Sequence, residues 1–179
     1  FSKFVLMKKA QFWYADFLLG LLILFFITYI FSRVIIDLNT REDKIQELVN
    51  DATSIANSFT STGYLSYNEW FNRQGRIGFV ENGKVINEKL EDFERMLNNN
   101  GYEISQFLLG TSNNYIIYFE DKNTNIVENK VYGKFNNINE LNELEVENLI
   151  RITRFVYYDN NEDNLGELVR MNILVWSSL

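Results

Sequence analysis

Two hydrophobic patterns follow one another in residues 12–59, whose sequence is FWYADFLLGLLILFFITYIFSRVIIDLNTREDKIQELVNDATSIANSF. Between Phe12 and Phe31 the only charged residue is Asp16, so a helix over this part would be apolar on every face. At 1.5 Å per residue, about 20 helical residues cross a hydrocarbon core of about 30 Å. We therefore expect an apolar transmembrane helix over residues 12–36.

The second pattern is amphipathic. Apolar residues recur at helical intervals, with charged residues between them. The apolar residues are Ile45, Leu48, Val49, Ala52, Ile55, Ala56 and Phe59. Such intervals place the apolar side chains on one face of a helix. The chain has no proline, and no glycine lies between Gly20 and Gly63. We expect one helix from about residue 8 to about residue 60, amphipathic over residues 37–62.

The composition excludes several classes of function. The 179 residues include no Cys and no His, which rules out a disulfide scaffold, a thiol nucleophile, a Ser-His-Asp triad and a His-ligated metal. Residues 1–36 hold four basic residues and one acidic residue, whereas residues 37–179 hold 13 basic and 23 acidic residues. An acidic body of this kind argues against nucleic acid as the primary partner. Lys8 and Lys9 place the N-terminal end of the apolar segment in the cytoplasm.

Residues 63–179 read as a globular, β-rich domain. Asn82-Gly83 predicts a hairpin between strands at residues 76–80 and 84–86. Asn87 is expected to cap a helix over residues 88–97, which a left-handed Gly101 ends, and a second helix over residues 104–109 closes at Gly110. Further strands are expected at residues 115–120, 126–132, 149–158 and 167–176. The fold class is α+β, with the long helix packed on an antiparallel sheet of four or more strands.

Three polar stretches have alternative interpretations. Residues 121–125 and 159–164 present oxygens at alternate positions, but neither has the Gly and Glu of a calcium loop, so polar hairpin turns are the better interpretation. Residues 140–147 alternate acidic and apolar residues. That run fits a solvated face better than paired catalytic carboxylates, because no base partner or glycine-rich loop accompanies it.

A retained apolar half-helix that continues into an amphipathic half and carries a small acidic domain resembles a type IV pilin. The resemblance is most specific at Lys8-Lys9-Ala10-Gln11, followed by Asp16 inside the apolar segment. Archaeal type IV pilin-like precursors have a short basic class III-type leader, a small residue and then Gln, with an acidic residue about five positions on. The resemblance implies that a prepilin peptidase cuts between Ala10 and Gln11, or one residue later. Residues 1–11 are then a leader, with Met7 a possible start, or an N-terminal extension if the mature chain begins at Phe1.

A second region carries the same resemblance. Several short motifs are similar to the block that follows the long helix in archaeal pilin-like proteins, namely Gly63-Tyr64, Trp70, Arg76-Ile77-Gly78-Phe79, residues 82–87, Lys89-Leu90 and Leu108-Leu109-Gly110. The family often has Pro where this chain has Tyr64.

The resemblance implies a structural subunit of an archaeal surface filament for adhesion or surface attachment, with no enzymatic activity, cofactor or metal. Its partners would be other copies of itself, the membrane before assembly, the prepilin peptidase and the pilus assembly machinery. The filament-core residues would include Phe12, Asp16, Phe17, Leu21, Leu24, Phe25 and Tyr29. Asp16 would either pair with the N-terminal amine that cleavage exposes or extend its carboxylate to water at the membrane interface. The alternative function is a bitopic membrane-anchored protein whose extracytoplasmic domain binds a ligand or partner, and a membrane-tethered carboxylate hydrolase is a weaker third hypothesis.

Overall fold

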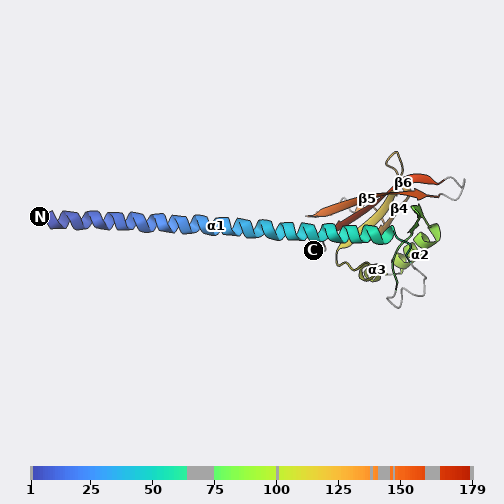
Figure 1. Ribbon diagram of the computed structural model, residues 1–179, viewed down its shortest axis with the longest axis horizontal. Coiled ribbons are helices and arrows are strands. Elements are labelled where there is room, and N and C mark those ends of the chain that lie inside the picture. The colour runs from blue at the N-terminus through green and yellow to red at the C-terminus, as the bar shows by residue number, and fades with distance from the viewer. Residues whose placement is uncertain are drawn as a thin grey trace. The chain divides into compact units, whose positions relative to one another are not determined.

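The computed structural model describes residues 2–63, 75–99, 101–137, 139–140, 146, 148–159 and 166–177, with side chains from Trp13 onward (Figure 1). The chain divides into two compact units, Phe1–Lys44 and Ile45–Leu179. Helix α1 (Ser2–Phe59) begins in the first unit and ends in the second. The predicted single long helix is therefore confirmed, and it begins earlier than residue 8.

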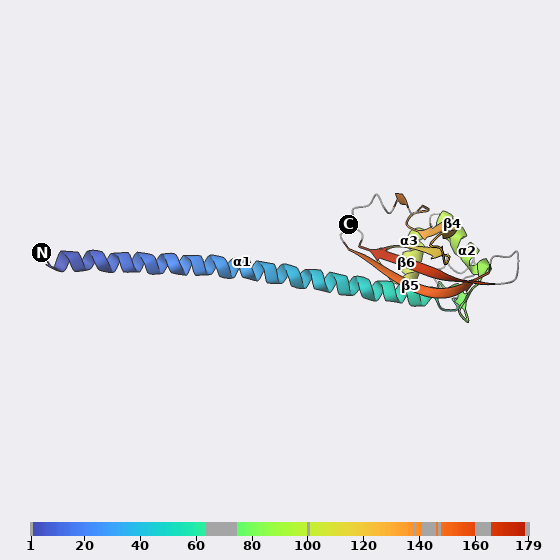
Figure 2. The ribbon, with the colours of Figure 1, turned by 90° about the horizontal axis from the view of Figure 1, so that it is seen from above.

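The second unit contains the end of α1, two short helices and a six-stranded sheet. The helices are α2 (Asn87–Asn98) and α3 (Tyr102–Leu109). The strands are β1 (Val80–Glu81), β2 (Lys84–Val85), β3 (Asn114–Glu120), β4 (Ile126–Gly133), β5 (Leu149–Tyr158) and β6 (Glu167–Trp176). Their order across the sheet is β1-β2-β5-β6-β3-β4, with β5 and β6 paired along their full length (Figure 2). The four long strands confirm the sequence prediction to within one residue at either end.

The sheet is mixed, so the prediction of an antiparallel sheet is wrong at one pair. Strand β2 runs parallel to β5, with Lys84 opposite Tyr157. The Tyr157 N–H donates to the Gly83 carbonyl over 2.8 Å and extends this short pairing. The other strand pairs are antiparallel. A parallel contact between segments so far apart in sequence leaves no signal in the local hydrophobic pattern, which is why sequence reasoning missed it.

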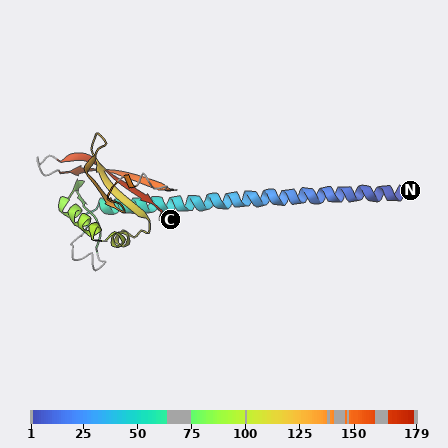
Figure 3. The same cartoon turned by 180° about the vertical axis from the view of Figure 1, so that it is seen from behind.

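The end of α1 forms the centre of the main core. Five apolar residues of its predicted stripe are at most 2% exposed, namely Leu48, Ala52, Ile55, Ala56 and Phe59. They pack with α2, α3 and one face of the sheet, which we call the inner face (Figure 3). Ile45 and Val49 are 43% and 36% exposed, so the predicted stripe is too wide at these two positions. Ile45 precedes the covered part of the helix by one turn, and Val49 lies at the margin of the stripe.

The segment after α1 approaches the helix end too closely for side chains at two glycines. A Cβ on Gly63 would lie 2.2 Å from the Gly78 nitrogen, and a Cβ on Gly78 would lie 2.3 Å from the Ser61 carbonyl oxygen. The Phe79 N–H donates to the Phe59 carbonyl over 3.3 Å. Residues 76–79 therefore pack against the end of α1, and the predicted strand over residues 76–80 is reduced to Val80 and Glu81.

The turn and cap predictions have mixed outcomes. Asn82 and Gly83 have φ angles of 52° and 81°, as the predicted two-residue hairpin requires. Gly110 ends α3 at a φ of 69°, as expected. Asn87 is not a cap, because α2 already includes it and its side-chain Nδ2 donates to the Asp159 carbonyl over 2.8 Å. Gly101 precedes α3 and has a φ of −85°, so it is not the left-handed terminator that was expected. A Cβ there would lie 2.5 Å from the Met96 carbonyl oxygen, so glycine is required because the two backbone segments approach closely.

Candidate functional site

The apolar part of α1 is the most unusual surface of the described chain. Large apolar side chains from Trp13 to Leu38 are between 39% and 80% exposed. Within the described residues, α1 is the helix that is long and apolar enough to cross a membrane. The Thr28 hydroxyl is satisfied within the helix, because its Oγ1 donates to the Leu24 carbonyl over 2.8 Å. Such a surface requires a lipid or protein environment, which the described part of the chain does not supply.

Two groups of amphipathic side chains lie along this segment. Trp13 and Tyr14 lie at its start, and Tyr29 and Arg33 lie before its last apolar residues, which end at Leu38. Arg33 Nε donates to the Tyr29 hydroxyl over 3.2 Å, and its guanidinium lies 5.6 Å from the Tyr29 ring centre. Aromatic and basic residues of this kind are enriched at membrane–water interfaces. The helical rise separates Trp13 and Arg33 by about 30 Å, which is the thickness of a bilayer core.

The structure gathers some of the predicted filament-core residues on one helix face and separates others. Phe17, Leu21, Leu24 and Phe25 are spaced four, three and one residues apart, so their exposed side chains lie on one face, and Tyr29 follows one turn after Phe25. Asp16 is exposed and lies to one side of this face, one turn before Gly20. Ala10, Gln11 and Phe12 lie within the helix, but their side chains are outside the described part.

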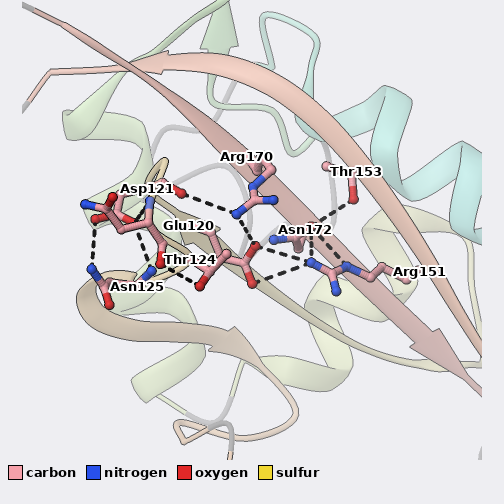
Figure 4. Close-up of polar contacts among 9 residues, drawn as sticks. Glu120, Asp121, Thr124, Asn125, Arg151, Thr153, Arg170 and Asn172 are labelled. Atoms are coloured by element: carbon pink, nitrogen blue, oxygen red, sulfur yellow. Dashed lines mark hydrogen bonds and ion pairs between the residues drawn. The ribbon is translucent and has the colours of Figure 1, made fainter.

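A polar cluster occupies the opposite, outer face of the sheet, and sequence reasoning did not identify it (Figure 4). The Glu120 carboxylate forms ion pairs with Arg151 at 3.3 Å and with Arg170 at 3.4 Å. Asn172 is fully buried, and its Oδ1 accepts hydrogen bonds from Arg151 Nε at 3.1 Å, Arg151 Nη2 at 2.9 Å and Thr153 Oγ1 at 2.8 Å. The contacts satisfy the Glu120 carboxylate and the Asn172 oxygen, whereas the buried Asn172 Nδ2 has no hydrogen-bond partner among the described residues. The ion pairs and hydrogen bonds favour a structural role in joining β3, β5 and β6.

The only sequence signal for this cluster was the alternation of polar and apolar residues along β5 and β6. Arg151 and Thr153 lie on the outer face of β5, and Arg170 and Asn172 lie beside them on β6. The local pattern indicates that these side chains share a face, but the pairing of the strands decides which ones meet.

The turn between β3 and β4 is a polar hairpin turn, as predicted. Asp121 Oδ1 accepts hydrogen bonds from the backbone N–H groups of Asn123 at 2.7 Å and Asn125 at 2.8 Å. These bonds, together with the nearby Lys122, hold the pKa of the Asp121 carboxyl below its ordinary value. The Asp121 carboxylate therefore stabilises the turn in which it lies. Residues 160–164 of the other candidate calcium turn and most of residues 140–147 lie outside the described part of the chain.

Buried tyrosines form a further group of side chains with shifted pKa values. Burial raises the pKa of Tyr102 to about 12, and it raises the pKa of Tyr115 further, although Tyr115 bonds to Ser105. Burial and neighbouring glutamates also raise the pKa values of Tyr132 and Tyr158. Phenols shifted in this direction stay protonated at neutral pH and are poor general bases. Among the described residues, no three His, Cys, Asp or Glu side chains lie close enough together to hold a metal ion.

The apolar segment of α1 is therefore the candidate functional site, because most polar groups on the outer face of the sheet bond to one another. Comparison of the chain with protein-family models, with curated proteins and with solved structures finds no match in any of the three.

Proposed function

We propose that this chain is a structural subunit of a type IV-like surface filament, which polymerises through the apolar part of α1. The observation that carries the proposal is the change of environment along one continuous helix. Large apolar side chains up to Leu38 are exposed, whereas the stripe from Leu48 to Phe59 is buried in the chain's own core. The second part of the helix thus anchors the domain, and the first part is left for other molecules.

Burial of the apolar segment away from water holds such a polymer together once the chain has left the membrane. A fully buried Leu or Phe side chain contributes about 1.5–3 kcal/mol, and the segment carries many of them on every face. A single neighbour covers only one face of a helix, so several copies must surround each segment. Copies related by a rotation that does not close form a helical polymer. In such a polymer the acidic domains form the outer layer, with no catalytic step required.

Asp16 has a specific role in this proposal. An unpaired carboxylate inside an apolar segment costs about 2.5–3.5 kcal/mol on membrane-insertion scales. No described side chain of the same helix donates to it, and it is exposed. Removal of a leader after Ala10 would place a positively charged terminal amine one to two turns from Asp16. The amine of the same or a neighbouring subunit would then neutralise the carboxylate in the filament core.

A bitopic membrane-anchored protein is the second candidate, and one observation favours it. The Trp13–Tyr14 and Tyr29–Arg33 groups lie one bilayer thickness apart, as in a helix that resides permanently in a membrane. A filament subunit also passes through the membrane before assembly, so these groups are compatible with both functions. The two candidates differ in whether the segment finally contacts lipid or other copies.

Assembly of the full chain and of a shortened chain starting at Asn39 tests the proposal. The shortened chain keeps the buried stripe and loses the apolar segment, so we expect a soluble protein that forms no polymers. The full chain should form long polymers when detergent is removed, as light scattering and negative-stain microscopy would detect. A full chain that inserts singly into lipid vesicles, with no filaments on the producing cells, would support the bitopic protein instead.

A further inference from the structure

Among the residues that the structure describes, one edge of strand β5 is unpaired along most of its length. Its Tyr157 N–H points away from β6, because it donates to the carbonyl of Gly83, the residue before β2. Residues on an antiparallel strand alternate in the direction of their backbone groups. The N–H and C=O groups of Leu149, Arg151, Thr153 and Phe155 therefore also point away from β6, while those of the intervening residues pair with it.

These outward groups have no partner within the described part of the chain. Strand β2 covers β5 only at Tyr157, and no hydrogen bond from another described residue reaches the outward backbone groups of residues 149–155. The side chains beside them are exposed, including Leu149 at 44% and Phe155 at 68%. Phe155, Tyr157 and Leu168 together expose about 300 Å² of the outer face, which is the size of the largest apolar patch on a typical monomer.

The other edges of the sheet are protected against strand addition. Strand β1 has two residues, which is too short to template another strand. Strand β4 is irregular, because its pairing with β3 shifts between Tyr118 and Glu120. Glu128 and Asn129 of β4 have φ angles of 55° and 51°, outside the extended region. The regular, exposed edge of β5 is therefore the place where the sheet can grow.

We propose that this edge binds the same edge of a second copy of the chain, antiparallel and about a two-fold axis at Ile152. In this register Leu149 lies opposite Phe155 of the second copy, and Arg151 lies opposite Thr153 of the second copy. Every outward N–H and C=O group of these four residues then gains a partner. A shift of the axis by one residue toward Tyr157 leaves Leu149 opposite Tyr157, whose backbone is already paired with β2. A shift by one residue the other way places Arg151 opposite Arg151 of the second copy. The pairing with β2 and the like charges thus select the register.

The side chains and charges of β5 are compatible with a contact between identical strands. Strand β5 contains no acidic residue, although residues 37–179 as a whole carry a large negative charge. Two copies therefore meet without the repulsion between acidic residues that separates them elsewhere, and the register places Arg154 opposite Ile150 of the second copy and not opposite a second Arg. Arg151 is held by Glu120 and Asn172 of its own chain, and the register places it opposite Thr153 and not opposite a second Arg. The apolar Leu149 and Phe155 cover each other at both ends of the contact.

This contact is independent of the filament proposal. A two-fold contact closes on itself and cannot lengthen a polymer. It would instead join subunits of two neighbouring filaments, or two chains before assembly, through the domain and not through the apolar helix. The two proposals can therefore fail separately.

Engineered cysteines test the register directly, because the chain contains no Cys of its own. Ile150, Ile152 and Arg154 have backbone groups that pair with β6, so across the new contact they form close pairs with Cα atoms about 4.5 Å apart, within disulfide range. The full-length chain in detergent should form a disulfide-linked dimer with Ile152→Cys. Neither Ile150→Cys nor Arg154→Cys should do so alone, but a mixture of these two variants should cross-link.

A matched pair of substitutions separates the backbone contact from general effects on folding. Thr153→Ala and Thr153→Pro both remove the hydroxyl that bonds to Asn172, but only Pro also removes the outward N–H. In the Ile152→Cys chain, Thr153→Pro should slow cross-linking by about tenfold or more, because each copy loses a donor and gains a ring at the contact. Thr153→Ala should not, and circular dichroism would verify that both variants are folded. Equal cross-linking at all three cysteine positions, or none at Ile152, would overturn the proposal, even if the chain forms filaments.

Discussion

Replacement of Phe59 by alanine should destabilise the globular unit more than any exposed substitution on the same helix. The Phe59 side chain is fully buried, and its ring centre lies 5.0 Å from that of Phe79, 5.6 Å from that of Phe93 and 6.1 Å from that of Tyr115. Truncation of a buried Phe to Ala costs about 3–5 kcal/mol. Three aromatic contacts and a site closed on all sides place Phe59 at the upper end of that range. Total domain stabilities are about 5–15 kcal/mol, so the loss is a large fraction of the whole.

Thermal unfolding of the full chain in detergent, followed by near-ultraviolet circular dichroism, would measure this effect. For a domain of this size, about 3 °C of Tm per kcal/mol corresponds to a decrease of about 10–15 °C for Phe59→Ala. Ile45→Ala is the matched control, because Ile45 lies on the same helix and the same face but is 43% exposed. Its Tm should change by no more than about 2 °C. Equal effects of the two substitutions would refute the assignment of α1 as the central helix of the core.

Three further predictions concern the apolar segment and the turn at Asp121. Asp16→Ala should leave membrane insertion intact, because it makes the segment more apolar, but should lower filament yield; normal assembly would show that Asp16 is a tolerated interfacial residue. Mature protein from cells should begin at Gln11 or Phe12 by N-terminal sequencing, and recovery of Phe1 would refute that processing site. The folded-state pKa of Asp121 is lowered, so its stabilising contribution is present at neutral pH and is lost as the pH falls through the acidic range. Asp121→Ala should therefore reduce the acid dependence of Tm. An unchanged profile of Tm against pH would contradict the turn geometry.

The parts of the fold that local patterns determine could be predicted. The period of apolar residues located α1, and the alternation of β-branched and aromatic residues located β5 and β6 with their exact ends. Asn82-Gly83 marked its hairpin because both residues must adopt positive φ angles. In each case the residues that form the element also carry the information about it.

The parts that depend on distant contacts could not be predicted. Gly101 looked like a helix terminator, but the constraint on it is the Met96 carbonyl that a Cβ would meet. Asn87 looked like a cap, but its side-chain amide donates to the carbonyl of Asp159, the residue after β5. The parallel pairing of β2 with β5 joins residues that are far apart in the sequence, so the local pattern of residues does not predict it.

The candidate site shows the same division. The apolar segment from Phe12 onward was evident from composition, because a helix with large apolar side chains on every face cannot bury them all against one small domain. The polar cluster around Asn172 was not, because Arg151, Glu120 and Arg170 come together only through the order of β5, β6 and β3. The open edge of β5 is likewise a property of the sheet, since it exists where β2 ends.

Electron microscopy of surface material sheared from the producing cells, combined with mass spectrometry of the same material, tests the central claim most directly. We predict thin helical filaments in which this chain is a component, with the apolar segment of α1 in the filament core and the acidic domain outside. Detection of the chain only in the membrane fraction, as single spans with lipid around Phe17, Leu21 and Phe25, would contradict the filament proposal.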